Sequence, residues 1–180
     1  LERESPDFAF VAAPAHLNAA VTRPLLDRGI HTLMEKPPGL TAEETTDLRN
    51  AARKSGALCM VGWNRRFHPL LCRARELVAE RGAITPIVAE FHKSLARLDI
   101  DRWPERLRDN MLLETPIHAL DQCRVLADSE PLEVHAFERR ALGKYVDIHA
   151  AMITFENGCV AQFSANYTTD ARLERYELHG

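Results

Sequence analysis

Three short apolar segments, separated by two helical stretches, constrain the fold of this chain more than any other feature. The segments 8–12, 30–34 and 58–62 are continuous apolar runs, and such runs are typical of strands buried on both faces of a parallel sheet. Helical stretches at about 16–28 and 41–54 lie between them. Because strands joined by crossover helices run parallel, this third of the chain predicts a Rossmann-like, doubly wound α/β sheet.

The helix boundaries in this part carry recognisable signals. Thr41-Ala-Glu-Glu44 matches a capping box, in which the Thr41 hydroxyl accepts from the Glu44 amide and the Glu44 carboxylate returns to the Thr41 amide. Gly29 and Gly56 follow the two helices, where glycine commonly ends a helix. Pro24 predicts a kink or a restart inside the first helix.

A different pattern begins near residue 65. An amphipathic helix is expected from Pro69 to Gly82, and 97–109 is interpreted as a charged loop. The Asn157-Gly158 pair indicates a hairpin between two alternating segments. Strands that alternate in this way fit an open, mostly antiparallel sheet with one face on a core. We therefore expect a partial Rossmann-like domain over 1–64 and an α/β domain over 65–180, with strands at 87–94, 132–140, 146–155, 159–167 and 173–179.

Composition excludes some classes of function. The 180 residues carry a formal net charge of −3 with both signs interspersed, which predicts no nucleic-acid surface. No apolar run approaches the ~20 residues that span a bilayer, and no signal peptide is visible, so we expect no membrane partner. The cysteines form no CxxC pair and favour free thiols in a reducing cytoplasm over two disulfides.

The sequence Glu35-Lys36-Pro37-Pro38-Gly39 ends the second predicted strand abruptly. Open α/β sheets bind ligands at the carboxyl ends of their strands, and a lysine amine in such a place is suited to proton transfer. The two prolines would fix the backbone, and a cis Lys36–Pro37 bond fits this arrangement. The alternative is a solvated turn with an incidental lysine.

A second constellation is Glu114-Thr-Pro-Ile-His118-Ala-Leu-Asp121. A helix that begins near Leu113 would place Glu114, His118 and Asp121 on one face, where a carboxylate can tune the imidazole as an acid or base. The alternative is an ordinary helix with a surface ion pair.

The histidines and two arginines are further candidates for binding groups. The eight histidines show no HxxxH or similar spacing, so we expect no metal site. Arg65 and Arg66 follow the third strand, where they could bind a phosphate or carboxylate, or belong to a polar connection.

The segments around Lys36, Arg65 and His118, in this order, resemble motifs of the Gfo/Idh/MocA oxidoreductases, the glucose–fructose oxidoreductase and inositol dehydrogenase group. The family motif E-K-P is Glu35-Lys36-Pro37, and V-G-x-x-R-R-F-x-P is similar to 61–69. The motif D-x-G-x-H-x-x-D resembles 114–121, with Glu for Asp and Pro for Gly. T-P-N-x-x-H resembles Ala13-Pro14-Ala15-His16, with its His displaced and Ala in place of Asn.

The resemblance implies hydride transfer between NAD or NADP and a sugar, cyclitol or related alcohol/carbonyl substrate. Lys36 would be the catalytic amine, His118 the acid/base, and Glu114 would occupy the place of the family's Asp. The family also implies a homo-oligomer, a dimer or tetramer, in the cytoplasm. The cofactor-binding residues implied by the resemblance are Pro14, His16, Glu35, Lys36 and Arg65.

The chain departs from the family pattern in several of its motifs. It contains no G-x-G-x-x-G and no acidic residue about twenty positions later to read the ribose, so it does not distinguish NAD from NADP. We therefore expect that these 180 residues are part of a longer chain. Strand 8–12 would then lack a neighbour and expose its edge, and the sequence does not determine whether these residues alone are active. Glu114 and Pro116 also leave a second interpretation, a non-catalytic relative that acts as a sheet-mediated binding or assembly module.

Overall fold

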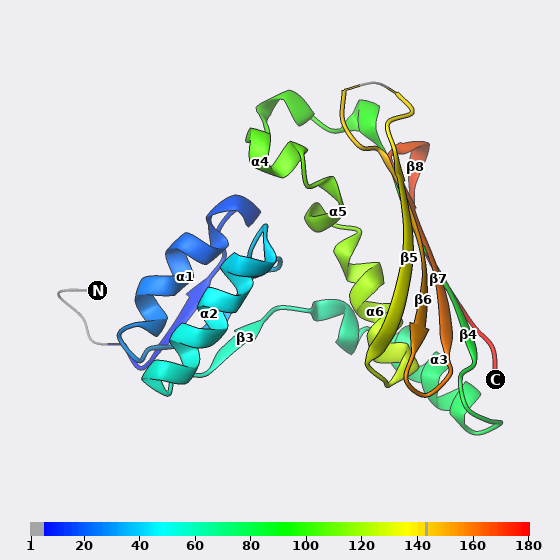
Figure 1. The fold of residues 1–180 in the computed structure, drawn as a ribbon, viewed down its shortest axis with the longest axis horizontal. Coiled ribbons are helices and arrows are strands. Elements are labelled where there is room, and N and C mark those ends of the chain that lie inside the picture. The colour runs from blue at the N-terminus through cyan, green and yellow to red at the C-terminus, as the bar shows by residue number, and fades with distance from the viewer. Residues whose placement is uncertain (1–5, 143) are drawn as a thin grey trace. The chain divides into compact units, whose positions relative to one another are not determined.

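The computed structural model describes residues 6–142 and 144–180, so the first five residues of the domain expected over 1–64 lie outside the described residues. The chain divides into two compact units (Figure 1). Unit 1 comprises Leu1–Trp63 and Pro104–Glu114, and unit 2 comprises Asn64–Trp103 and Thr115–Gly180.

Unit 1 contains a three-stranded parallel sheet. Its strands β1 (Phe8–Val11), β2 (His31–Met34) and β3 (Cys59–Val61) lie in the order β1-β2-β3. Val11 pairs with Met34, and Thr32 pairs with Cys59. The alternation of strand and helix in the sequence therefore predicted the sheet correctly.

The crossover segments of unit 1 are a 3-10 turn, η1 (Ala15–Leu17), followed by α1 (Asn18–Leu26), and the longer α2 (Ala42–Ser55). α1 runs through Pro24 and ends two residues later, so the helix does not restart at Pro24, and the kink stays a prediction. A proline that close to the end of a helix removes one hydrogen bond and leaves little helix beyond it to bend.

The sheet of unit 1 is covered on one face. α1 and α2 lie side by side, as Figure 1 shows, and Leu26 from α1 and Leu48 from α2 pack with Met34 in the core. The expectation that these strands are buried on both faces is wrong, because both crossovers lie on the same face. On the other face four large apolar side chains are half or more exposed: Phe8, Phe10, Leu58 and Met60.

The segment 97–109 is not the plain loop that its charge suggested, because residues 95–114 form a series of short helical turns. In unit 2 they form the short turns η3 (Leu95–Arg97) and η4 (Ile100–Arg102). In unit 1 they form the short helices α4 (Glu105–Arg108) and α5 (Met111–Glu114). Leu107 and Met111 are buried, so apolar residues spaced four apart give this charged segment an inward face.

Unit 2 contains a five-stranded mixed sheet in the order β5-β6-β7-β4-β8. Three neighbouring pairs are antiparallel, and β4 runs parallel to β7, so the predicted open, mostly antiparallel sheet is confirmed. The strands are β4 (Pro86–Ser94), β5 (Pro131–Arg139), β6 (Ile148–Phe155), β7 (Val160–Asn166) and β8 (Thr168–Leu178).

One face of this sheet packs on α6 (Ile117–Ala127). Phe91, Phe163 and Ile153 belong to the buried core of this side, whereas Met152 and Phe137 on the other face are about half exposed. The helix α3 (Pro69–Ala79) begins at the predicted proline after a 3-10 turn, η2 (Asn64–Phe67). Unit 2 is therefore a sheet with helices on one side and a bare face on the other.

Local signals in unit 2 agree with the structure. Gly158 has a φ of 85° in the turn between β6 and β7, and its amide donates to the Phe155 carbonyl at 2.9 Å, as the Asn-Gly pair predicted.

The expectation of free thiols is confirmed for Cys59, Cys72, Cys123 and Cys159. Within the described residues, no helix combines the length and apolar character needed to cross a membrane.

Candidate functional site

The loop that follows β2 carries Lys36 at the carboxyl edge of the parallel sheet. The Glu35 amide donates to the Val11 carbonyl at 2.9 Å, which extends the pairing of β1 and β2 to the start of the loop. The Lys36–Pro37 peptide bond is cis, as the sequence suggested. Pro37 is buried and Glu35 is exposed, so the loop turns from the sheet edge into the interior within three residues.

Asn18, the first residue of α1, holds this loop from one side. Its Nδ2 lies 3.0, 3.2 and 3.1 Å from the carbonyl oxygens of Glu35, Lys36 and Pro37. Asn18 has no exposed surface. An amide nitrogen with two hydrogens therefore serves three consecutive backbone acceptors on both sides of the cis bond.

The first turn of α2 holds the end of the loop. The Thr41 hydroxyl accepts from the Glu44 amide at 3.1 Å, as the capping box predicted. A Glu44 carboxylate oxygen also accepts from the Leu40 amide at 2.7 Å, a contact that the capping box did not predict. The predicted Thr41 amide bond lowers the pKa of the same carboxyl. Gly39 permits this packing, since a Cβ there would lie 2.6 Å from Glu44 Cβ.

Glu44 also carries the clearest electrostatic effect near the loop. Burial raises the pKa of its carboxyl, but the Arg106 guanidinium and the Leu40 and Thr41 amides lower it more, so the net pKa is below the ordinary value. Arg106 lies on α4 and donates to Glu44. The segment Pro104–Glu114 is thus attached to the loop region within unit 1.

Lys36 is held at the far end of its side chain as well. Its Nζ donates to the backbone carbonyl of Glu114, the last residue of α5. Of the three residues predicted to be catalytic, Lys36 and Glu114 are thus brought together, through a main-chain oxygen of Glu114.

Some residues at the same edge suit a dinucleotide. Because β1 pairs with β2, the segments that begin with Ala12 and Glu35 leave adjacent strands. Pro14 is exposed at the start of η1, and His16 Nδ1 is buried with no hydrogen-bond partner among the described residues. A polar ligand group at this edge could bond that nitrogen. These features fit the nicotinamide end of NAD(P), whereas the chain has no glycine-rich turn for the pyrophosphate.

His118 is buried in the first turn of α6 in unit 2. The predicted helix from Leu113 through Asp121 is wrong, because α5 ends at Glu114 and α6 begins at Ile117. Pro116 explains the break, since the residue before a proline is disfavoured in helical conformation and a proline is tolerated in a first turn. Glu114 and His118 therefore belong to separate helices.

The two arginines after β3 are bound to carboxylates of unit 2. Arg65 Nε lies 2.9 Å from a carboxylate oxygen of Glu174, which also accepts from the Tyr176 hydroxyl at 3.2 Å. Burial and the Glu174 charge raise the pKa of Tyr176. Arg66 Nε lies 2.9 Å from Asp121 Oδ2, and this bond raises the pKa of Arg66. Both guanidiniums thus have carboxylate partners within their own unit.

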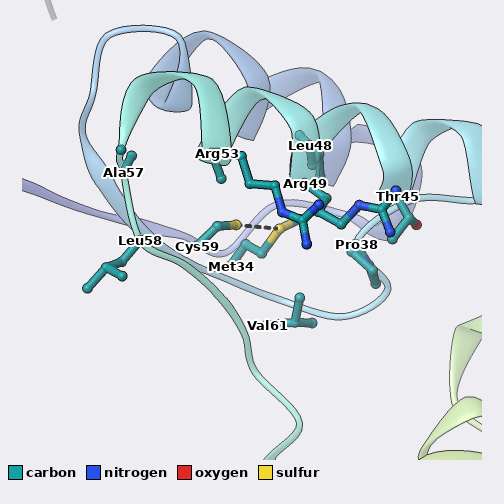
Figure 2. Close-up of a pocket in the computed structure, with 12 residues that line it drawn as sticks. Met34, Pro38, Thr45, Leu48, Arg49, Arg53, Ala57, Leu58, Cys59 and Val61 are labelled. Atoms are coloured by element: carbon teal, nitrogen blue, oxygen red, sulfur yellow. Dashed lines mark hydrogen bonds between the residues drawn. The ribbon is translucent and has the colours of Figure 1, made fainter.

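Figure 2 shows a pocket of about 440 Å³ between α2 and β3. Its lining is mostly apolar and includes Leu48 and Val61, and the side chains of Arg49 and Arg53 also line it. Cys59 Sγ lies 4.0 Å from Met34 Sδ, and burial raises the pKa of the Cys59 thiol. None of the predicted catalytic or cofactor-binding residues is among the described residues that line it, although Pro38 of the Lys36 loop is.

Sequence reasoning missed Asn18. The expected match of T-P-N-x-x-H places the family's His at His16, but counted from Pro14 the last position of the motif is Asn18. Among the residues that this motif places after β1, Asn18 is the one whose side chain bonds the Lys36 loop. The spacing of the motif was therefore the signal that could have found it.

Comparison with known proteins identifies both parts of the chain. Residues 1–63 match the family described as "Oxidoreductase family, NAD-binding Rossmann fold", and residues 72–180 match the "GFO/IDH/MocA C-terminal domain". A D-xylose 1-dehydrogenase (NADP(+)) of Haloferax volcanii is 29% identical, over 97% of this chain and 58% of its own length.

Solved structures of similar proteins agree with these family matches. The UDP-N-acetylglucosamine 3-dehydrogenase GnnA from Acidithiobacillus ferrooxidans is 26% identical with a TM-score of 0.78, over 97% of this chain and 53% of that one. GenD2 from gentamicin A biosynthesis, solved in complex with NAD, is 25% identical with a TM-score of 0.82, over 97% and 52%. The chain spans about half the length of the relatives it matches. Because family profiles match both of its parts and the fold agrees, the chain belongs to the Gfo/Idh/MocA oxidoreductase family.

Proposed function

We propose that this protein is an NAD(P)-dependent oxidoreductase that transfers a hydride between the nicotinamide and a sugar, cyclitol or related alcohol/carbonyl substrate. The observation that supports it most is the position of Lys36, at the carboxyl end of a parallel strand and with both ends of its side chain fixed. Ligands of open α/β sheets bind at that edge, which supports a substrate oxygen binding near this amine.

Lys36 has a defined task in this proposal. Oxidation of an alcohol removes a proton from oxygen as the hydride leaves carbon, and the bound nicotinamide supplies the hydride acceptor. Lys36 donates a hydrogen bond to that oxygen and keeps it oriented, and His118 takes its proton or returns it in the reverse direction. Glu114 contributes its main-chain carbonyl, which fixes the Lys36 amine before the substrate binds.

The cofactor contacts remain proposals of the same kind. Pro14, His16, Glu35 and Lys36 would line the nicotinamide end, since they follow β1 and β2 at one edge of the sheet. Arg65 would contribute only if the cofactor competes with Glu174 for its guanidinium. The residues that read the ribose are not in this chain, so NAD and NADP are equally compatible.

The relatives support the class of substrate. Their names include D-xylose 1-dehydrogenase, UDP-N-acetylglucosamine 3-dehydrogenase and scyllo-inositol 2-dehydrogenase. Such substrates share adjacent hydroxyl groups on a ring. A lysine amine can donate a hydrogen bond to the oxygen of such a hydroxyl, and a neutral imidazole nitrogen can accept one from it.

We further propose a homo-oligomer, a dimer or tetramer, in the cytoplasm. The bare face of the unit 2 sheet has a shallow hollow of about 400 Å³ lined by Phe137, Met152 and Val88, which suits contact with a second copy. Four free thiols fit a reducing compartment. A family member that only assembles through this face is the competing interpretation.

Replacement of the lysine tests the proposal. We expect Lys36→Met in the complete gene product to lower kcat by roughly 100- to 10,000-fold, because the substrate oxygen loses its donor. Lys54→Met is the matched control, since Lys54 is an exposed lysine of the same unit, on α2. Turnover near the wild-type level in Lys36→Met, with a coupled sugar or cyclitol substrate, would exclude this role of Lys36.

Cofactor binding is a separate measurement. We expect NADH or NADPH fluorescence to change on titration with the complete gene product at micromolar concentration. No binding and no turnover, together with an oligomer that survives replacement of both Lys36 and His118, would favour the assembly module. Binding without turnover on any sugar or cyclitol tested would contradict the proposed substrate class alone.

A further inference from the structure

We propose that Asn18 is the positioning residue of the active-site lysine. Its buried side-chain amide fixes the carbonyls on both sides of Lys36 and thereby sets where the Lys36 amine lies. This inference rests on the proposed function in one respect, that Lys36 meets the substrate oxygen. It adds a residue that contacts neither substrate nor cofactor and acts through Lys36.

The chemistry of the contact admits only a donor. All three atoms facing Asn18 Nδ2 are carbonyl oxygens, at 3.0 to 3.2 Å, so an oxygen in the same place would be repelled. Two N–H bonds are shared among three acceptors, and Asn18 itself has 0% exposed surface. Its contact with the Pro37 carbonyl is buried, so removal of this donor would leave a buried carbonyl without this bond, which is costly.

The local helix does not explain this side chain. Asparagine is favoured at helix N-termini because its oxygen can accept from backbone amides there. In α1 the N-cap residue is Leu17, and no side-chain cap hydrogen bond is made. Asn18 instead reaches residues 17 to 19 positions further along the chain. The bonds therefore serve the loop rather than the helix on which Asn18 lies.

Lys36 is consequently held at both ends. Asn18 fixes the main chain on either side of its Cα, and the Glu114 carbonyl accepts from its Nζ. A lysine has four rotatable side-chain bonds, so an anchored backbone limits the volume the amine can explore. A shift of about 1 Å at a catalytic group can lower the rate about 100-fold, so the loss of this anchor should lower kcat.

A double-mutant cycle measures whether Asn18 acts through Lys36. We expect Asn18→Leu in the complete gene product to lower kcat by roughly 10- to 100-fold and to leave the Kd for NADH or NADPH within about twofold. In a Lys36→Met background the same change should lower the residual kcat by less than about twofold, because there is no amine left to misplace. An equal loss in both backgrounds would overturn the inference.

Two further variants separate positioning from burial. Thr22 is as buried as Asn18, lies one turn further along α1, and its hydroxyl has no hydrogen-bond partner among the described residues. Thr22→Val should therefore leave kcat unchanged. Asn18→Asp preserves the size of the side chain but replaces the donor by an acceptor, so it should lower kcat at least as much as Asn18→Leu. Wild-type kcat in Asn18→Asp would contradict the proposal.

One measurement needs neither activity nor a variant. The side-chain NH₂ protons of Asn18 should exchange with solvent far more slowly than those of Asn50, which is exposed on the surface of α2. Nitrogen-15 NMR of the wild-type chain reports both. Equal exchange rates would show that the amide is not bonded as inferred, and this outcome remains decisive even if the Asn18 variants fail to fold.

The lysine can also be observed directly. The 180 residues contain four lysines, Lys36, Lys54, Lys93 and Lys144, so a chain labelled with ε-¹³C lysine gives few signals. Asn18→Leu should shift the Lys36 signal toward that of a solvated lysine and leave the Lys54 signal unchanged. This shift without any dehydrogenase activity would support the positioning and refute the proposed function. An unchanged Lys36 signal in an active enzyme would refute the positioning role of Asn18 and leave the proposed function standing.

Discussion

The two units hold their functional side chains in different ways. In unit 1 the Lys36 loop is fixed by side chains that bond to its main chain, with Asn18 on one side and Glu44 on the other. In unit 2 Arg65 and Arg66 are fixed by carboxylates of other side chains. A main-chain anchor sets where the backbone lies, whereas a side-chain pair sets only where two long side chains meet.

The difference also decides what a sequence can reveal. The Glu44 contacts span a few residues, so a capping motif pointed to most of them. The partners Arg66 and Asp121 are 55 residues apart, and Arg65 and Glu174 are 109 apart. Nothing in the local pattern near either arginine indicates which carboxylate it meets.

The largest effect on stability is expected in unit 2. Asp121 is 8% exposed and Arg66 is 37% exposed, so Asp121→Ala leaves a guanidinium that can regain part of its hydration. We expect a loss of about 2 kcal/mol in the free energy of unfolding, below the cost of removing one partner of a fully buried pair.

Denaturant unfolding of Asp121→Ala, Arg66→Ala and the double variant measures the coupling between the two side chains. A coupling energy of about 1 kcal/mol or more is expected for residues in direct contact. Strictly additive losses would mean that this pair does not stabilise unit 2.

A smaller effect is expected where the loop of unit 1 packs on α2. Gly39→Ala would place a Cβ 2.6 Å from Glu44 Cβ and 3.1 Å from the Thr45 nitrogen, so helix or loop must shift. We expect a loss of about 1–2 kcal/mol, as for other overpacked sites. Gly82→Ala is the control, because its Cβ would meet only an ordinary contact at 3.7 Å. Equal melting temperatures for the two variants would contradict the close packing.

The smallest effect concerns the charge on Glu44. Glu44→Gln keeps an acceptor for the Leu40 amide and loses the ion pair with Arg106, which is 56% exposed, so we expect a loss of about 0.5 kcal/mol at pH 7. The pKa of Glu44 is lowered in the folded state, so its charge stabilises the fold above the unfolded pKa near 4.5. That contribution is lost as the pH falls through the folded pKa.

Wild type and Glu44→Gln should therefore converge in stability in acid. Urea midpoints measured between pH 7 and pH 3 test this expectation. A difference that grows as the pH falls would mean that the carboxylate is not stabilised in the folded state.

Much of the fold could be predicted from particular residues. The apolar segments before Pro14, Glu35 and Gly62 are strands, and the Asn157-Gly158 turn lies where its sequence indicates. Burial of both faces could not be inferred, because Phe10 and Met60 give the same apolar signal whether or not a partner covers them. The sequence did not predict the break between α5 and α6 at Pro116, because the i,i+4 spacing of Glu114 and His118 was the only basis for placing both on one helix.

The candidate site was also predicted only in part, because local sequence patterns reveal some of its residues and not their distant partners. Lys36 was identified because its neighbours in sequence are unusual for the end of a strand. Its anchors could not be identified, because Asn18 lies on a preceding helix and the Glu114 carbonyl is a backbone atom that every residue possesses. A side chain that bonds main-chain atoms leaves no complementary residue for a pattern to detect.

The place of β4 has a consequence for how the chain is made. β7 and β8 are separated only by Tyr167, yet they do not pair with each other, because β4 lies between them. β4 leaves the ribosome early and must wait for strands that begin at Val160 and Thr168. Closure of such long loops slows folding, whereas unit 1 pairs strands soon after their synthesis. The parallel sheet should therefore form first, and β4 would spend that interval as an unpaired strand that chaperones can recognise.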